Sequence, residues 1–175
     1  MTMTAPVFHT DRLVLRAPQP SDVGPWTAFV TSERARFIGG PAEDANRAWR
    51  IFATIAGHWA LRGWGSFVFC DRATGRPVGH CGPWQPEGWP EPEIAWCVWD
   101  PAAEGRGLAF EAARAAIAHA FRDLRWPTAV SYVEPGNARS IRLAGRLGAL
   151  REEAAPRIAP GDLVFRHPRP AEAAA

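Results

Sequence analysis

The sequence predicts an α/β (α+β) fold in which strands, some of them antiparallel, are flanked by helices. Three observations support this class. Short apolar runs typical of strands alternate with longer stretches that have the 3.6-residue period of helices. Two neighbouring strand-like runs are separated by a turn that contains glycine, which indicates an antiparallel hairpin. No internal repeat appears, and the predicted order along the chain is β, αα, βββ, α, β, α, ββ.

The first third of the chain is predicted to form one strand and two helices. RLVLRAP, residues 12–18, has the composition of a strand. SDVGPWTAFVT follows as a helix, with Ser21 and Asp22 as candidate caps of its N-terminus. A second helix is expected over residues 43–61.

The middle of the chain changes to the pattern of strands at Gly65. GSFVFCD and RATGRPVGHCGPW, joined across the turn signal Ala73-Thr74-Gly75, predict the antiparallel hairpin. A loop rich in proline and tryptophan, residues 82–93, then leads into the strand EIAWCVW. A helix is expected to begin at Gly107.

The last third is predicted to contain a strand, a helix and a closing strand. TAVSYVEPGNARSIRLAGRLGAL has the pattern of a strand, a Pro-Gly turn and a helix that stops at Gly148. DLVFRH is expected to form the final strand, and residues 171–175 a frayed, disordered tail. We therefore expect one domain over residues 1–170, which is an ordinary size for a single core.

Charge and composition exclude several classes of protein. The chain has 20 basic and 18 acidic residues, a net charge of +2, and all of its basic residues are arginine. This mild balance does not favour a nucleic acid or a membrane surface as partner. The N-terminus lacks the pattern of a signal peptide, and no run approaches the roughly 18 apolar residues of a membrane span. We expect a soluble, cytoplasmic protein, and we leave a homodimer open.

The three cysteines also argue against two kinds of site. Cys70, Cys81 and Cys97 are odd in number, far apart and without CxxC spacing. This pattern is not that of a disulfide framework or a zinc site, and it suits a reducing compartment. We expect no metal.

The stretch EGRGLAFEA is the strongest candidate for a ligand site. A helix N-terminus offers amide groups without intrahelical partners and a positive partial charge, which suit phosphate oxygens. Gly105 and Gly107 would leave the backbone bare, and Arg106 would add a full charge. A pyrophosphate is therefore the candidate ligand, and a plain strand-to-helix turn is the alternative. The GxGxxG fingerprint and the GK[ST] of a P-loop are both absent.

Five motifs in order resemble one known family. They are TDRLVLR, GRPVGHCG, EIAW, EGRGLAFEA and EPGNARSIRLAGRLGA, and they cover nearly the whole chain. In these the chain resembles the GCN5-related N-acetyltransferases (GNAT), in the branch of the ribosomal-protein-alanine N-acetyltransferases. The resemblance implies the GNAT fold, with a mixed, mostly antiparallel sheet that is flanked by helices and splayed between its fourth and fifth strands, and with acetyl-CoA in the cleft.

The resemblance also implies which residues would bind the cofactor. Pyrophosphate would be held by the amides of Gly105, Arg106, Gly107, Leu108 and Ala109. The pantetheine arm would pair with the strand through Trp96, Cys97 and Val98 and would contact Asn137, for which an N-cap is the alternative role. One departure is visible, because the family pattern QxxGxG/A or RxxGxG/A begins here with Glu104. We expect Glu104 to contact the ligand through its backbone only.

Two residues are candidates for the chemistry of amine acetylation, which needs a base for the amine and a proton for the departing thiolate. Glu93, at the start of EIAW, matches the family's glutamate and is the candidate base, although it could instead hold a neighbouring backbone. Ser140 matches the serine that the ribosomal branch places near the thioester sulfur, and it is the candidate acid. The tyrosine that many relatives use is replaced by Ala144, and the chain's only tyrosine, Tyr132, lies in the preceding strand.

Two weaker patterns concern the surroundings of this site. Arg139, Arg142 and Arg146 recur at roughly helical spacing, so they either reach the 3′-phosphate or form a solvated face. Trp64, Trp84, Trp89 and Trp96, with Glu87, Glu91 and Glu93, either form an aromatic, acidic mouth for a cationic amine or pack a rigid loop.

The hypothesis that follows is an acetyl-CoA-dependent N-acetyltransferase that transfers the acetyl group directly to a primary amine, either a protein N-terminus or a small molecule. The alternative is a catalytically silent module that binds acyl-CoA as a sensor or for interaction.

Overall fold

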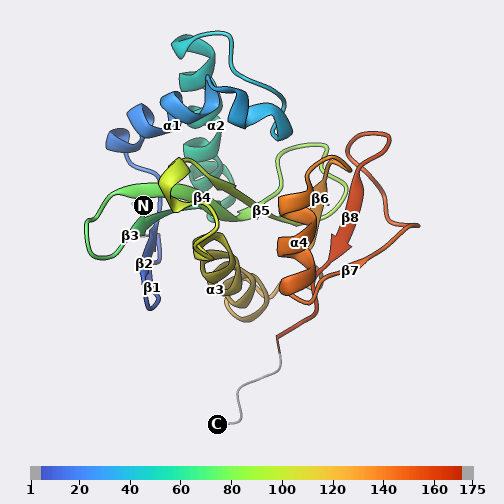
Figure 1. Ribbon diagram of the computed structural model, residues 1–175. Helices are drawn as coiled ribbons and strands as arrows, with labels where there is room; N and C mark the ends of the chain where they lie inside the picture. The colour runs from blue at the N-terminus through green and yellow to red at the C-terminus, as the bar shows by residue number, and fades with distance from the viewer. Residues whose placement is uncertain (1–4, 171–175) are drawn as a thin grey trace.

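The computed structural model describes residues 5–170 and is built on one eight-stranded sheet of order β1-β2-β3-β4-β5-β6-β8-β7 (Figure 1). The strands are β1 (Phe8–His9), β2 (Leu13–Arg16), β3 (Phe67–Asp71), β4 (Pro77–Trp84), β5 (Glu93–Val98), β6 (Val130–Val133), β7 (Leu150–Arg151) and β8 (Leu163–Arg166). The helices are α1 (Val23–Val30), α2 (Ala45–Arg62), α3 (Leu108–Arg122) and α4 (Ala138–Arg146), with short 3₁₀ turns η1 (Pro20–Asp22), η2 (Glu33–Phe37) and η3 (Pro101–Ala103). The tail predicted for residues 171–175 lies outside the described residues.

The sheet opens between β5 and β6. These two strands are parallel and pair only at Glu93 and Val130, whereas β4 and β5 pair antiparallel along all six residues of β5. β6 instead pairs antiparallel with β8. The sequence analysis did not predict β1, so the strands that it counted as fourth and fifth are β5 and β6. The predicted splay between these two strands is therefore confirmed.

Helices cover both faces of the sheet (Figure 1). Because side chains alternate along a strand, the core divides in two. Leu13, Leu15, Phe67 and Phe69 pack with α3 on one face. Val68, Cys70 and Trp99 pack with α1 and α2 on the other face. On β5, Ile94 and Trp96 accordingly belong to the α3 face, while Cys97 belongs to the α1–α2 face.

The predicted elements are present, with small shifts at their ends. The second helix begins at Ala45, where Asp44 accepts a hydrogen bond from the Arg47 amide at 2.7 Å, rather than at residue 43. Gly148, at φ +79°, follows the end of α4 as expected. Asp22 makes no side-chain cap for α1 and is instead buried against Arg16, at 2.7 Å. Within residues 5–170, no helix has the length and apolar character needed to cross a membrane.

Candidate active site

The loop before α3 presents bare backbone. Gly105 and Gly107 have φ angles of +73° and +76°, a left-handed conformation that favours glycine. A Cβ added at Gly105 would meet no heavy atom within 4 Å, and at Gly107 only Arg12 Nη2 at 3.6 Å. Gly107 occupies the N-cap of α3 and supplies no side-chain acceptor to the first amides of the helix. The loop therefore makes the strand-to-helix turn and also leaves amide donors available for an anion.

Arg12, which belongs to the motif TDRLVLR, forms hydrogen bonds with this loop and with the first turn of α3. Its Nη1 donates to the Arg106 carbonyl at 2.8 Å, and its Nε donates to Glu111 at 2.7 Å. Glu111 lies in the first turn of α3 and also accepts a bond from the Thr10 hydroxyl at 2.6 Å. Sequence reasoning did not find this role, because Arg12 and Glu111 meet only when β2 lies beside α3.

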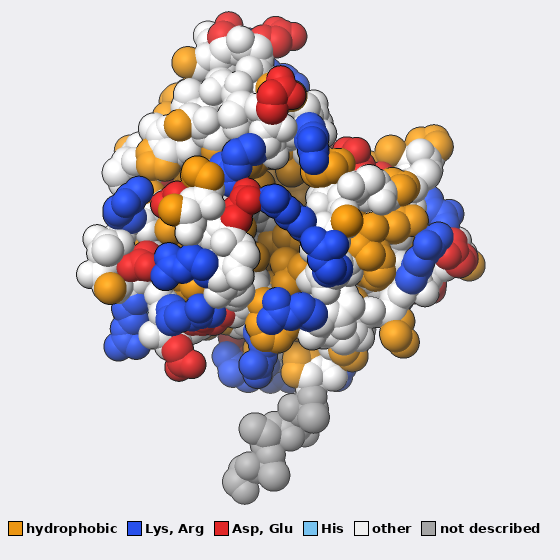
Figure 2. Space-filling view, in the orientation of Figure 1, with side chains coloured by type: hydrophobic (Ala, Val, Ile, Leu, Met, Phe, Trp, Pro, Cys, Tyr) orange, Lys and Arg blue, Asp and Glu red, His pale blue; other side chains and the backbone are white. Residues whose placement is uncertain are grey.

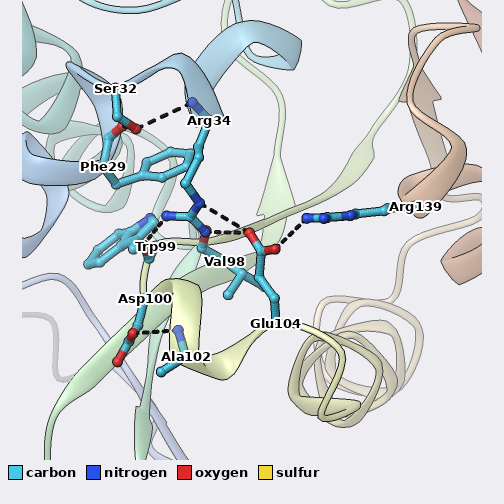
Figure 3. Close-up of polar contacts among 9 residues, drawn as sticks. All are labelled: Phe29, Ser32, Arg34, Val98, Trp99, Asp100, Ala102, Glu104 and Arg139. Atoms are coloured by element: carbon cyan, nitrogen blue, oxygen red, sulfur yellow. Dashed lines mark hydrogen bonds and ion pairs between the residues drawn. The ribbon is translucent and has the colours of Figure 1, made fainter.

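Glu104 connects the two sides of the sheet opening (Figure 3). One carboxylate oxygen accepts bonds from Arg34 Nη2 at 2.5 Å and Nε at 3.1 Å, and the other accepts a bond from Arg139 of α4. Burial raises the pKa of Glu104, but the hydrogen bonds and charges of Arg34 and Arg139 outweigh it, and the net shift is downward. Glu104, which departs from the family pattern, is thus ionised, and the positive charges of Arg34 and Arg139 balance its negative charge.

Arg34, which sequence reasoning missed, also contacts the end of β5. Its Nη2 donates to the Val98 carbonyl at 3.0 Å, and its Nη1 donates to the Trp99 carbonyl. Val98, Cys97 and Trp96 lie beyond the single pair that joins β5 to β6, so this edge of β5 faces the opening. Burial raises the pKa of the Cys97 thiol to about 12.

Glu93 lies where β5 and β6 part. It is buried, 8% exposed, and accepts a bond from Trp89 Nε1 at 2.7 Å. Burial raises the pKa of Glu93 to about 7, although hydrogen bonds from Trp89 and from the Tyr132 backbone lower it. By strand alternation its side chain is on the α1–α2 face, together with that of Cys97. A carboxylate of this kind exchanges a proton readily near neutral pH.

Ser140 lies in the first turn of α4. Its amide donates to Asn137 Oδ1 at 3.1 Å, so Asn137 is the N-cap of this helix. Its hydroxyl oxygen accepts a bond from Trp96 Nε1, also at 3.1 Å. α4 packs on the face of β6 that carries Val133, with Ala144 fully buried between them. Ala144 thus has a packing role in the core.

The side chains of the predicted aromatic, acidic mouth are mostly engaged in packing and ion pairs. Trp84 stacks on His58, and Trp64 packs edge-on against Trp126. Glu91 accepts two bonds from Arg166, at 2.8 and 3.0 Å. Of the predicted aromatic, acidic mouth, Trp89 and Glu93 are in direct contact.

The three arginines of α4, Arg139, Arg142 and Arg146, are all exposed, and two of them also have partners on neighbouring segments. Arg139 binds Glu104, and the Arg146 guanidinium lies 4.5 Å from the centre of the Phe110 ring. Figure 2 shows arginine side chains gathered around a hollow in the middle of the side of the molecule that faces the viewer, with apolar side chains visible at the floor of the hollow. Another depression is lined by residues of α2 such as Trp49 and Leu61 and by Glu87 of the predicted mouth, but by none of the residues predicted to bind CoA or to catalyse the reaction. Among residues 5–170, no three acidic, histidine or cysteine side chains are grouped as metal ligands would be.

Known proteins share both the sequence pattern and the fold. The family model of the acetyltransferase (GNAT) domain matches residues 12–150. The crystal structure of an acetyltransferase from Agrobacterium tumefaciens has 35% sequence identity and a TM-score of 0.87, over 95% of this chain and 96% of that chain.

Two more distant crystal structures share the fold. A ribosomal-protein-S5-alanine acetyltransferase from Vibrio fischeri has 13% identity and a TM-score of 0.69, over 94% of this chain and 97% of that one. A spermidine N-acetyltransferase from Vibrio cholerae, in complex with CoA and spermine, has 17% identity and a TM-score of 0.69, over 90% and 94%. Together with the matched family model, the 35% identity to the Agrobacterium enzyme shows that the chain belongs to the GNAT acetyltransferase family.

Proposed function

We propose that this acetyltransferase uses acetyl-CoA and transfers the acetyl group directly to a primary amine, held on the side of the sheet opposite to the cofactor. The observation that carries the proposal is the opening between β5 and β6, which has Glu93 on the α1–α2 face and Ser140 on the helix that covers the other face. A base and a hydrogen-bond donor on opposite sides of one gap suit a reaction in which an amine attacks from one side and a thiolate leaves on the other.

The residues around the opening fit the cofactor. The amides of residues 105–109 would hold its pyrophosphate, since the loop has open space above Gly105 and no side-chain cap at Gly107. The edge of β5 from Trp96 to Val98 would pair with its pantetheine arm, and Asn137 would contact the same arm in addition to capping α4. Acetyl-CoA, when bound, would supply the acetyl thioester.

Glu93 would act as the general base. With a pKa of about 7 it is about half ionised at neutral pH, so it can accept the amine's proton directly or through one water. Trp89 Nε1 and the Tyr132 backbone hold the carboxylate and leave its remaining lone pairs for the substrate. Ser140 would stabilise the departing thiolate through its hydroxyl.

Direct transfer is favoured over a covalent acyl-enzyme because no thiol of the chain is activated. Burial raises the pKa of Cys70, of Cys81 and of Cys97. The thiolate is the nucleophilic form of cysteine, so none of the three is ready to carry an acyl group.

The acceptor that suits this site best is an α-amine or a similarly weakly basic small amine. An α-amine, with a pKa of about 7.7 to 8.0, is roughly a tenth deprotonated at pH 7, whereas an amine near 10.4 is deprotonated less than about one part in a thousand. Glu91 is already paired with Arg166, and Glu87 lies 3.6 Å from Arg62. Glu87 is fully exposed, so of these two carboxylates only Glu91 is neutralised, which reduces the negative charge that could attract a polycation.

Thiol release from acetyl-CoA tests the proposed function. We expect turnover with an α-amino peptide, with rates that rise with pH through the amine's own titration, and preference over spermidine when both are present at equal concentration between pH 6 and 9. Preference for spermidine at pH 7 would reject the α-amine. Tight CoA binding without turnover on any amine of a mixed panel would identify the silent acyl-CoA-binding module instead.

A Glu104→Gln variant tests the charge balance beside the pyrophosphate loop. Removing the carboxylate leaves Arg34 and Arg139 with their full charge, so we expect CoA to bind about 3- to 10-fold more tightly at low salt. The gain should shrink at high salt, where screening weakens exposed charges. Calorimetric titration with CoA at two salt concentrations measures it, and Glu153→Gln, at an exposed carboxylate, controls for net charge. Weaker binding by Glu104→Gln would contradict the prediction.

A further inference from the structure

We propose that Trp96 is a positioning residue that sets the direction of the Ser140 hydroxyl toward the thioester sulfur. This inference rests on the acetyl transfer proposed above and adds to it a residue whose side chain the family resemblance leaves without a role. The argument depends on how the Trp96 ring is held, on which bonds the serine makes and on what is left for its proton.

The Trp96 ring is fixed by apolar packing on several sides. It lies on the α3 face of β5 and contacts three clusters of buried side chains, one centred on β2, β3 and α3, one on the C-terminal half of α3 and one on α4. The ring also packs edge-on against the buried His167, with ring centres 6.1 Å apart. A ring held in this way cannot turn its N–H to another partner without disturbing all of these contacts.

The indole N–H decides which bonds Ser140 can make. An indole nitrogen only donates, so at 3.1 Å from Trp96 Nε1 the serine oxygen must be the acceptor. A serine in a helix often returns its proton to a carbonyl of the preceding turn. Within residues 5–170, Ser140 Oγ makes no such bond, and the Asn137 side chain engages the serine's amide rather than its hydroxyl. The single hydroxyl proton is therefore left for a ligand.

The position of the serine indicates which ligand atom receives that proton. Ser140 is on α4 and Trp96 on β5, so their hydrogen bond spans the opening in which the thioester would lie. Accepting a bond from the indole also polarises the O–H group and strengthens it as a donor. Ser140 would hydrogen-bond the sulfur as the C–S bond breaks and the sulfur keeps the electron pair. The amine nitrogen forms the new C–N bond and gives its proton to Glu93, which passes it to solvent water, and solvent water returns one proton to the thiolate.

Kinetics of four variants test this role. Trp96→Phe keeps the ring but removes the N–H, and we expect kcat to fall about 2- to 10-fold, the loss of one neutral hydrogen bond, with KM for acetyl-CoA unchanged. Ser140→Ala should also lower kcat, and Trp96→Phe added to Ser140→Ala should cause no further loss, because Trp96 acts through the serine. Trp59→Phe is the matched control, since its N–H donates at 3.0 Å to the Ser66 carbonyl outside the proposed site.

An NMR measurement tests the hydrogen bond between Trp96 and Ser140 without turnover and without the Trp96→Phe variant. In protein labelled with ¹⁵N-tryptophan, Ser140→Ala should move the Trp96 indole proton upfield and speed its exchange with solvent. CoA should move the same resonance more than desulfo-CoA, because the serine contacts the sulfur. An indole signal that is unchanged by Ser140→Ala, or identical shifts with both ligands, would overturn the inference.

The outcomes separate this inference from the proposed function. Native turnover in Ser140→Ala would reject the proposed hydrogen bond from Ser140 to the sulfur, and Trp96's role with it. A slow Ser140→Ala enzyme combined with a native Trp96→Phe enzyme would support the role of Ser140 at the sulfur and reject the role of Trp96. Losses that simply add in the double variant would show that Trp96 acts through packing alone.

Discussion

A Glu93→Gln variant is expected to turn over acetyl-CoA about 10²- to 10⁴-fold more slowly than the native enzyme at neutral pH, the usual range for loss of a general base. The amide has nearly the shape of the carboxylate and can still accept the bond from Trp89 Nε1, so the architecture around β5 is kept. What is lost is the capacity to take the amine's proton. KM for acetyl-CoA should change little, because Glu93 lies on the face of the sheet opposite to the proposed cofactor site.

The pH profile gives this prediction a second, independent readout. Native kcat/KM should rise through the pKa of Glu93, about 7, and again through that of the amine. In Glu93→Gln only the second rise should remain. Glu153→Gln makes the same chemical change at an exposed carboxylate and should have a native profile. A near-native rate with both rises preserved in Glu93→Gln would return Glu93 to the alternative role of holding the backbone.

The same substitution should change stability in the opposite direction to activity. The folded state raises the pKa of Glu93 from its usual 4.5 to about 7, mainly through burial, so folding favours the neutral form. This contribution to the free energy of unfolding is fully present below pH 4.5 and is lost as the pH rises through 7. A shift of this size corresponds to on the order of 3 kcal/mol. The Tm of Glu93→Gln relative to the native protein should therefore increase between pH 5 and pH 8.

Local signals explain how much of the fold could be predicted. In the hairpin of β3 and β4, Asp71 and Gly75 determine the shape of the turn. Before α3, Gly105 and Gly107 occupy positions with a left-handed backbone that favours glycine. β1 was missed because two residues, Phe8 and His9, are too few to carry a period. The opening between β5 and β6 was expected from the family resemblance, since no local pattern in either strand reveals that they part.

The polar partners of the site could not be predicted from local sequence. Arg34 meets Glu104 across 70 positions of the chain, and Trp96 meets Ser140 across 44. Each residue by itself has a common alternative role, as a solvated charge or a core ring. Only the sheet order brings them together, and so the sequence indicated the glycine loop and the two candidate catalytic residues without the side chains that hold them.

A Gly105→Ala variant is expected to lose most of the stabilisation that CoA gives to the native protein. A methyl group at this position projects into the open space above the loop, where the pyrophosphate is proposed to lie. Loss of one charge-assisted hydrogen bond weakens binding by about 10- to 100-fold. CoA at 100 times its native Kd stabilises the folded state by about 2.7 kcal/mol, which at about 2–4 °C per kcal/mol raises Tm by about 5–10 °C. The variant, if 100-fold weaker, would gain only about 1 °C.

The matched control for this experiment is Gly75→Ala. Gly75 lies in the hairpin turn with a φ of +71°, against +73° for Gly105, and a Cβ there also meets no atom within 4 Å. Both substitutions therefore impose the same backbone strain, about 1–2 kcal/mol, and should lower the Tm of the ligand-free protein equally. Only Gly105→Ala should lose the CoA-induced shift. A native shift in both variants would mean that the pyrophosphate is not held over this loop.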